Sequence, residues 1–144
     1  YWATAKQHSM ENLSMHDQIY IVQTKIIEEL AEKGDCVIVG RCADYILRDK
    51  HPLRLFIYAG MPSKLKRCRE KSHEDDALND RRLARRIRRV DRNRARYYEY
   101  YTGNKWGERI NYDLMINTSN VSIKESVHSL VALLGASAEG MGEK

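Results

Sequence analysis

Residues 36–59 read CVIVGRCADYILRDKHPLRLFIYA, and this stretch decides the fold class. The run CVIVG at 36–40 is apolar and β-branched without alternation, which is typical of a strand buried on both faces in a parallel sheet. Residues 42–49 have the pattern of a short helix, which His51-Pro52 stops. The run LRLFIYA at 53–59 predicts a second strand. A strand, a helix and a strand in succession favour an α/β fold built on a parallel sheet.

Helices flank this stretch, so the alternation of helix and strand continues along the chain. Three Ser residues are each followed three positions later by an acid, as in the capping box at the start of a helix. They are Ser14 with Asp17, Ser72 with Asp75, and Ser122 with Glu125. The other expected elements are helices over 14–33, from Gly60 to Cys68, over 73–101 and over 123–134, and a third strand over 113–117. We expect one domain over 1–134 and a flexible tail over 135–144.

A block of arginines dominates the charge of the chain. Residues 81–96 read RRLARRIRRVDRNRAR, with nine arginines against one aspartate. The block therefore carries +8 in a chain whose total is +5, so the other residues sum to −3. Guanidinium is a planar fork that binds phosphate oxygens bidentately and does not lose its proton. Such a block predicts binding to nucleic acid or to a small phosphorylated ligand.

A helical wheel divides the arginines of this block into two groups. An apolar stripe on one face contains Leu83, Ile87, Val90, Tyr97 and Tyr101. The opposite face, where we expect solvent, contains Arg81, Arg85, Arg88, Arg92 and Arg96. Arg94 falls within the apolar stripe, where an unpaired guanidinium would be expensive. We therefore expect a partner for Arg94, either an internal carboxylate or an anionic ligand, and Asp91 one turn earlier could orient it.

The ends of the predicted strands give a second candidate position. Ligands of parallel sheets bind at the carboxyl ends of the strands. Arg41 follows the first predicted strand, so it is the first candidate for a ligand-facing charge, and residues 117–120 lie at another such end. No G-x-x-x-x-G-K-[ST], H-E-x-x-H, paired C-x-x-C or G-x-S-x-G motif occurs. The chain has residues that can grip phosphate, without a loop that activates it.

The three cysteines and the lack of long apolar runs suggest a cellular setting. Cys36, Cys42 and Cys68 lack metal-ligand spacing, so we expect reduced thiols, with Cys36 buried in its strand, and no metal held by side chains. No apolar run approaches the roughly 20 residues that span a bilayer, and no signal-peptide pattern opens the sequence. We expect a cytoplasmic protein without a membrane partner.

Five segments follow one another along the chain: CVIVGRCADYIL (36–47), LFIYA (55–59), VDRNRARYY (90–98), YTGNKWG (101–107) and NYDL (111–114). Together they resemble the cytidylate kinase-like family of P-loop nucleoside monophosphate kinases, from about Leu13 to Leu134. The resemblance implies a three-layer fold, with helices on both faces of a parallel sheet. It also implies phosphoryl transfer from ATP, with Mg²⁺, to a nucleoside monophosphate, CMP or dCMP.

The resemblance also assigns acceptor-binding roles to particular residues. The family's Gly-Arg-Asp motif falls on residues 40–42, so Arg41 is expected to contact the acceptor nucleotide. Cys42 replaces the Asp of that motif, and Asp44 is the candidate to substitute for it. The Asp-x-x-Arg pair of the family matches Asp91 and Arg94, which places both in the acceptor site.

The arginine helix resembles the family's lid. One lid arginine of the family corresponds to Ile87 here, so Arg86, Arg88 or Arg89 is expected to offset the charge on the transferring phosphoryl group. This reaction needs charge neutralisation and alignment rather than a nucleophilic side chain, and arginines that close over the phosphates supply both.

The front of the family fold has no counterpart in this sequence. The family begins with a strand, a Gly-rich phosphate loop and a helix, whereas this chain begins Tyr-Trp-Ala-Thr without a Met. We expect the natural N-terminus to lie upstream, and no ATP turnover by residues 1–144 alone. Two other functions stay open: a nucleotide-binding regulatory module on the same fold without turnover, and a nucleic-acid-binding protein that uses the arginine helix. A nucleic-acid-binding protein is expected to have a wide basic surface, and the charge of −3 outside the block argues against one. A homodimer is left open as the assembly.

Overall fold

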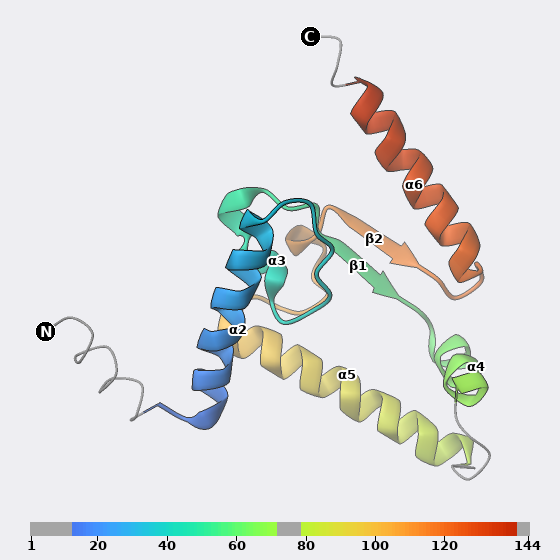
Figure 1. Cartoon of the computed structure of the whole chain (residues 1–144). Coiled ribbons are helices and arrows are strands. Elements are labelled where there is room, and N and C mark those ends of the chain that lie inside the picture. The colour runs from blue at the N-terminus through green and yellow to red at the C-terminus, as the bar shows by residue number, and fades with distance from the viewer. Residues whose placement is uncertain (1–12, 72–78, 141–144) are drawn as a thin grey trace, which may run out of the picture. The chain divides into compact units, whose positions relative to one another are not determined.

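The structure, a computed structural model of the chain, describes residues 13–71 and 79–140 (Figure 1). These residues divide into two compact units. The first contains the described residues up to Leu53 together with Tyr101–Gly103, and the second contains Arg54–Tyr100 together with the described residues from Asn104 onward. Within the described ranges, no helix is both long enough and apolar enough to cross a membrane.

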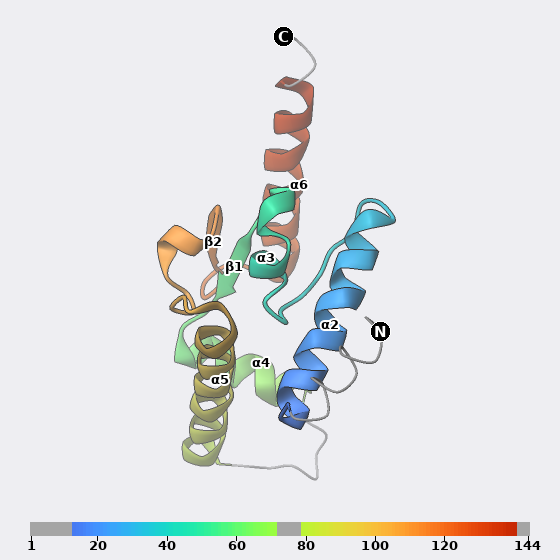
Figure 2. The same ribbon diagram turned by 90° about the vertical axis from the view of Figure 1, so that its left-hand side faces the viewer.

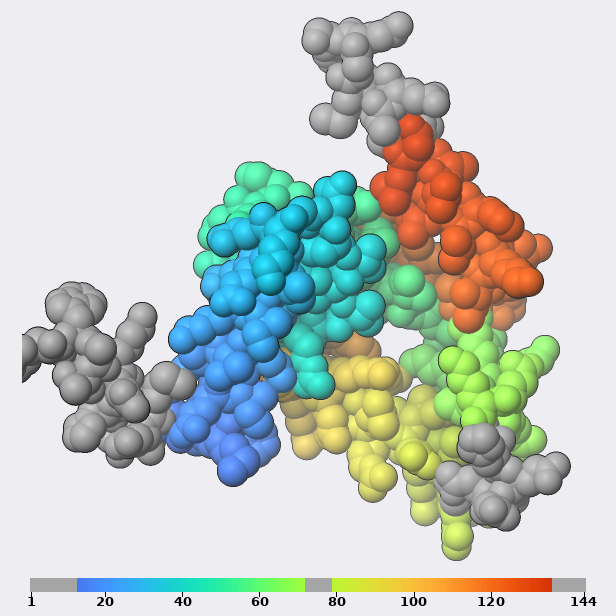
Figure 3. All heavy atoms as spheres, viewed as in Figure 1, coloured from blue at the N-terminus to red at the C-terminus, as the bar shows by residue number. Residues whose placement is uncertain are grey.

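The first unit packs a long helix against a short one. Helix α2 (Met15–Glu32) begins at Ser14, whose hydroxyl accepts a hydrogen bond from the Asp17 N–H at 3.2 Å, so the first predicted cap is confirmed. Ile27 of α2 is buried with Ala43 of helix α3 (Ala43–Ile46) and with Leu47. A 3₁₀ turn, η1 (Arg48–Lys50), follows α3. The short helix predicted over 42–49 is therefore present as α3 and η1. The blue and cyan atoms of this unit form one continuous surface in Figure 3.

The predicted strand at 36–40 is absent, which corrects the sequence analysis. These residues are not in a strand, and Val37 and Val39 are 94% and 89% exposed. Cys36 is exposed too, so its predicted burial is wrong. A strand is stabilised by ladder hydrogen bonds to a neighbour, and no described strand pairs with this segment. Apolar, β-branched composition alone therefore does not make residues 36–40 a strand.

The second unit is built on two parallel strands, which confirms the other two strand predictions. Strand β1 (Leu55–Tyr58) pairs with β2 (Leu114–Asn117), with Leu55 opposite Leu114 and Tyr58 opposite Asn117. The two arrows lie side by side in the views of Figures 1 and 2. An ion pair lies immediately before the two strands, where Arg54 Nη2 is 2.7 Å from Asp113 Oδ1. The described residues thus form a mixed α/β structure with a two-stranded parallel sheet and flanking helices.

Three helices belong mainly to this unit: α4 (Met61–Lys71), α5 (Asp80–Thr102) and α6 (Ile123–Gly140). The Ser122–Glu125 capping box is confirmed, since Ser122 N–H donates to Glu125 Oε2 at 2.9 Å and Glu125 N–H donates to Ser122 Oγ at 3.1 Å. Helix α6 continues beyond its predicted end at 134, and α4 beyond Cys68. The predicted cap at Ser72–Asp75 lies outside the described residues, as does the expected start of α5.

An aromatic cluster joins the segment after α5 to β1. The Phe56 ring lies edge-on to Trp106, with centroids 5.2 Å apart, and 4.8 Å from the ring of Tyr112. Between Trp106 and Tyr112 the chain passes Gly107 and turns through η3 (Arg109–Asn111), and it enters β2 two residues after Tyr112. Trp106 and Gly107, which both lie against Phe56, therefore have a packing role in this fold.

Candidate functional site

The arginine block forms most of α5 and contains an internal ion pair. Arg94 Nη1 donates to Asp91 Oδ1 at 3.2 Å, three residues earlier on the helix. The Asp91 side chain is 24% exposed, whereas that of Arg94 is 63% exposed. The carboxylate partner that the wheel allowed for is present. Asp91 orients Arg94 and leaves most of its guanidinium in solvent.

Arg94 is nevertheless not buried, which corrects its predicted place within the apolar stripe. The buried residues of α5 are Ile87, Tyr98 and Thr102. At 100° per residue they lie roughly 40–100° around the helix from Leu83, to one side of the predicted stripe. Arg94, at about 20° on the same wheel, lies at the edge of this face, so its long side chain reaches water. Tyr98, whose role the sequence left open, belongs to the core.

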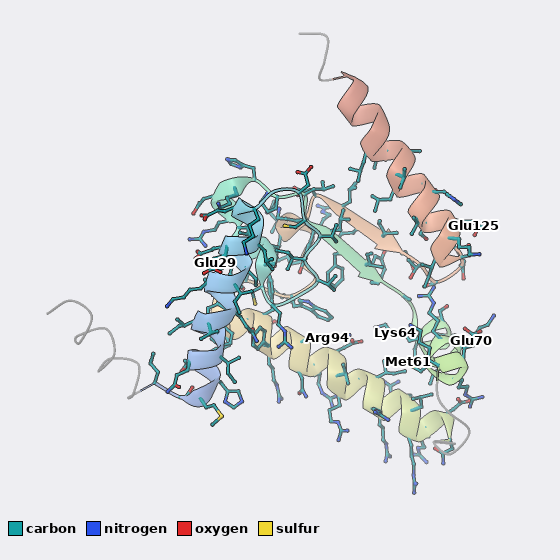
Figure 4. All side chains as sticks on the ribbon, viewed as in Figure 1. Glu29, Met61, Lys64, Glu70, Arg94 and Glu125 are labelled. Atoms are coloured by element: carbon teal, nitrogen blue, oxygen red, sulfur yellow. The ribbon has the colours of Figure 1, made fainter. Side chains whose placement is uncertain are left out.

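Asp91 has a second cationic partner, which the sequence analysis missed. Lys64 Nζ, from α4, lies 2.5 Å from Asp91 Oδ2, and its side chain is 32% exposed. Figure 4 labels Lys64 on α4 and Arg94 on α5. Two cations from two helices therefore bind the two oxygens of one carboxylate. The one sequence signal for Lys64 was its position in the first turn of the helix that follows a strand end, where ligands of parallel sheets bind.

The remaining arginines of the block are exposed along α5. Arg86, Arg88 and Arg89, the candidates for contact with a transferring phosphoryl group, are all exposed. The predicted outer face is exposed as well, at Arg81, Arg85, Arg88, Arg92 and Arg96. These side chains give α5 a strong positive field.

Arg41 and Asp44 belong to the first unit, in and after a tight turn. Arg41 and Cys42 both have φ of 57°, and the Ala43 N–H donates to the Gly40 carbonyl at 3.1 Å. Each non-glycine residue in this left-handed region costs about 1–2 kcal/mol, and such strain clusters at functional sites. The turn leaves Arg41 exposed and Cys42 buried.

The same turn makes Cys42 an unreactive thiol. Burial, with the charge of Asp44 as the second cause, raises the pKa of Cys42 to about 11. Cys42 stands where the related motif has Asp, and it brings no negative charge there at neutral pH. Asp44, two residues on, is the acid near this turn.

The carboxyl ends of β1 and β2 are joined by a hydrogen-bond network that the sequence did not reveal. Arg67 of α4 donates through Nη1 to Thr118 Oγ1 at 2.9 Å and through Nη2 to the Thr118 carbonyl. Gly60 N–H donates to Ser119 Oγ at 2.7 Å, and the Ser63 hydroxyl donates to the Ser119 carbonyl at 2.7 Å. Arg67 is therefore a structural residue that fixes α4, and with it Lys64, against the loop after β2.

The predicted site residues belong to two different units. Asp91 and Arg94 form a pair, with Arg86, Arg88 and Arg89 on the same helix. Arg41 and Asp44 form a separate group in the first unit. Within residues 13–71 and 79–140, no three His, Cys, Asp or Glu side chains gather as metal ligands.

Comparison with known proteins gives the family. Residues 2–120 match the cytidylate kinase-like family. The crystal structure of an uncharacterized protein from Eubacterium ventriosum ATCC 27560 is similar, with a TM-score of 0.73 and 27% identity over 89% of this chain and 70% of that chain. A search of curated proteins found no match. The family match includes the turn at Arg41, both strands and the arginine helix, so the chain belongs to the cytidylate kinase-like family.

Proposed function

We propose that this chain binds a nucleoside monophosphate, CMP or dCMP, as the acceptor in phosphoryl transfer from ATP. The observation that carries the proposal is the Asp91–Arg94 pair on the exposed arginine helix. A guanidinium that one carboxylate oxygen orients, and that is otherwise in solvent, is suited to binding a phosphate through two parallel hydrogen bonds.

The chemistry of phosphoryl transfer fits this arrangement. The reaction requires alignment of two phosphates and neutralisation of their charge, and the protein needs no covalent nucleophile. Arg94 would bind the acceptor phosphate and Asp91 would orient it and accept hydrogen bonds from the nucleoside. Arg86, Arg88 or Arg89 would offset charge on the transferring group. Mg²⁺ would enter with ATP as part of that substrate.

Arg41 adds support from the first unit. Two consecutive non-glycine residues at φ of 57° are strained, and the strain presents Arg41 to solvent. We propose that Arg41 also contacts the acceptor nucleotide and that Asp44 supplies the acid that Cys42 lacks.

The test measures CMP binding by isothermal titration calorimetry with the 144-residue chain. Arg94→Ala should weaken CMP binding by about 10- to 100-fold, the value of losing a charge-assisted, bidentate phosphate contact. Arg92→Ala is the matched control, because Arg92 is an exposed arginine of the same helix that makes no ion pair or side-chain hydrogen bond to another described residue. Cytidine, which lacks the phosphate, should bind equally weakly to all three proteins.

Two results would overturn the proposal. One is the absence of CMP binding by the unaltered chain, and the other is an equal effect of Arg94→Ala and Arg92→Ala. Tighter binding to a random oligonucleotide than to CMP, with steep salt dependence, would instead support the nucleic-acid function. CMP binding by the intact protein without ATP-dependent CDP formation would support the regulatory function.

A further inference from the structure

The carboxylate of Asp91 lies between two cations that come from different helices. Lys64 Nζ of α4 is 2.5 Å from Oδ2, and Arg94 Nη1 of α5 is 3.2 Å from Oδ1. Asp91 is the most protected of the three, with 24% of its side chain exposed against 32% for Lys64 and 63% for Arg94. The exposure rises outward from the α4–α5 contact, so Lys64 and Asp91 form the base of the cluster and Arg94 its solvent-facing end.

The two contacts constrain Asp91 in a way that one contact would not. A carboxylate held only by Arg94, three residues away on the same helix, can rotate and offer either oxygen. The bond from Lys64 fixes Oδ2 and leaves Oδ1 for Arg94. Lys64 is itself held, because Arg67 on the same helix binds Thr118 at the end of β2.

The charges of the cluster also matter for an anionic ligand. Without Lys64, Asp91 and Arg94 would sum to zero, and the carboxylate would repel a phosphate beside Arg94. With Lys64 the cluster carries +1. Lys64 therefore neutralises the charge of Asp91, while Asp91 still orients Arg94.

We propose that Lys64 is a positioning residue of the acceptor site, which acts through Asp91 to hold Arg94 ready for the phosphate of the nucleoside monophosphate. This inference rests on the proposed function for its substrate. Its structural part, that Lys64 controls the orientation of Arg94, stands without a nucleotide.

The first test replaces Lys64 in the 144-residue chain and measures CMP binding. Lys64→Met keeps an unbranched side chain, one atom shorter, and removes its charge. It should weaken CMP binding about 5- to 10-fold, because the Asp91 charge beside the phosphate is then no longer neutralised and Asp91 holds Arg94 less firmly. Lys64→Arg should restore the affinity to within about twofold, since it keeps the positive charge on the same helix turn. Lys66→Met is the matched control: it makes the same change at an exposed position of α4 that forms no ion pair with another described residue. It should bind CMP as the unaltered chain does.

A double-mutant cycle separates positioning from a direct contact with the ligand. If Lys64 acts through Asp91, then Lys64→Met should have little further effect in a chain that already carries Asp91→Asn. If Lys64 instead touched the phosphate directly, its loss would weaken binding to the same extent in both backgrounds. That additive result would overturn the positioning role.

A second measurement needs no nucleotide. The Nε–Hε signal of Arg94 in a ¹⁵N NMR spectrum, assigned through its loss in Arg94→Lys, reports how well the guanidinium is ordered. Lys64→Met should shift and broaden this signal, whereas Lys66→Met should leave it unchanged. An unchanged signal in Lys64→Met overturns the inference even if no nucleotide binds. If the signal moves but CMP does not bind, the positioning stands and the proposed substrate is wrong.

Discussion

Replacing Gly107 by Ala tests how the segment after the arginine helix is attached to the sheet. Gly107 has φ of 76°, in the left-handed region that L side chains rarely adopt. A Cβ added there would lie 3.0 Å from Cζ of Phe56 and 3.3 Å from its Cε1. The Phe56 ring cannot move away freely, because it packs against both Trp106 and Tyr112. Gly107→Ala therefore combines backbone strain with overpacking of a rigid aromatic cluster.

The magnitude follows from these two contributions. The left-handed backbone should cost about 1–2 kcal/mol with a Cβ present, and the overpacking should add about 1–3 kcal/mol. Gly103 supplies the matched control, because its φ of 70° is nearly the same but a Cβ there would meet nothing within 4 Å. Gly103→Ala should cost only the first contribution, so the difference between the two variants isolates the contact with Phe56.

Urea unfolding of the full chain, followed by Trp fluorescence and by far-ultraviolet circular dichroism, measures both variants. With an m-value of about 2 kcal/mol/M, the Gly107→Ala midpoint should fall roughly 0.5–1.5 M below that of Gly103→Ala. Trp106, next to Phe56, should also change its emission in Gly107→Ala before any urea is added. Equal midpoints for the two variants would refute the close approach of residue 107 to the Phe56 ring, and with it the packing role of the Trp-Gly segment.

Two further predictions concern Asp113 and the cysteines. Hydrogen bonds from the Arg54 side chain are the main cause that lowers the pKa of Asp113 below 3.8, followed by the Arg54 backbone N–H. The stability they contribute is therefore full above about pH 4 and is lost as the pH falls through the lowered folded pKa. Asp113→Asn should destabilise the chain by about 1 kcal/mol near neutral pH, a modest value because the pair is partly exposed. When the urea midpoint is plotted against pH, its fall at acid pH should be smaller in Asp113→Asn than in the unaltered chain. An equal fall in both proteins would contradict the pairing. Iodoacetamide at pH 8, followed by mass spectrometry, should modify the exposed Cys36 and Cys68 first, since the pKa of about 11 keeps buried Cys42 protonated; early labelling of Cys42 would contradict the buried turn.

Local signals predicted the elements whose partners lie within the described residues. The caps at Ser14 and Ser122 depend on atoms three residues apart, so the sequence contains all of the information they need. Strand β1 was predicted correctly because β2 is present to pair with it. The segment at 36–40 has equally strong strand composition, yet it is not a strand where no described neighbour supplies hydrogen bonds. Strand formation is a property of a pair, and a single sequence shows only one member of it.

The candidate site divides in the same way. The Asp91–Arg94 contact spans three residues of one helix, and a wheel places them on neighbouring turns. The contact of Lys64 with Asp91 joins residues 27 apart, and it depends on how α4 and α5 pack. The wheel also misplaced the centre of the buried face, because the side chains that become buried are decided by what packs against α5 and not by the stripe alone. Burial of Tyr98, and exposure of Arg94, follow from that packing.

Charge density alone does not distinguish Arg94 from the other arginines of α5. Every arginine of the block contributes to a positive field, which attracts any anion and is screened over about 8–10 Å at physiological ionic strength. Arg94 is paired with a carboxylate whose other oxygen is also held, so its fork has a defined direction. A defined direction is what a reaction that must align two phosphates needs, and a uniform field cannot supply it. Under the proposed function, the outward arginines would bring a nucleotide to the helix, and the Lys64–Asp91–Arg94 cluster would determine where its phosphate binds.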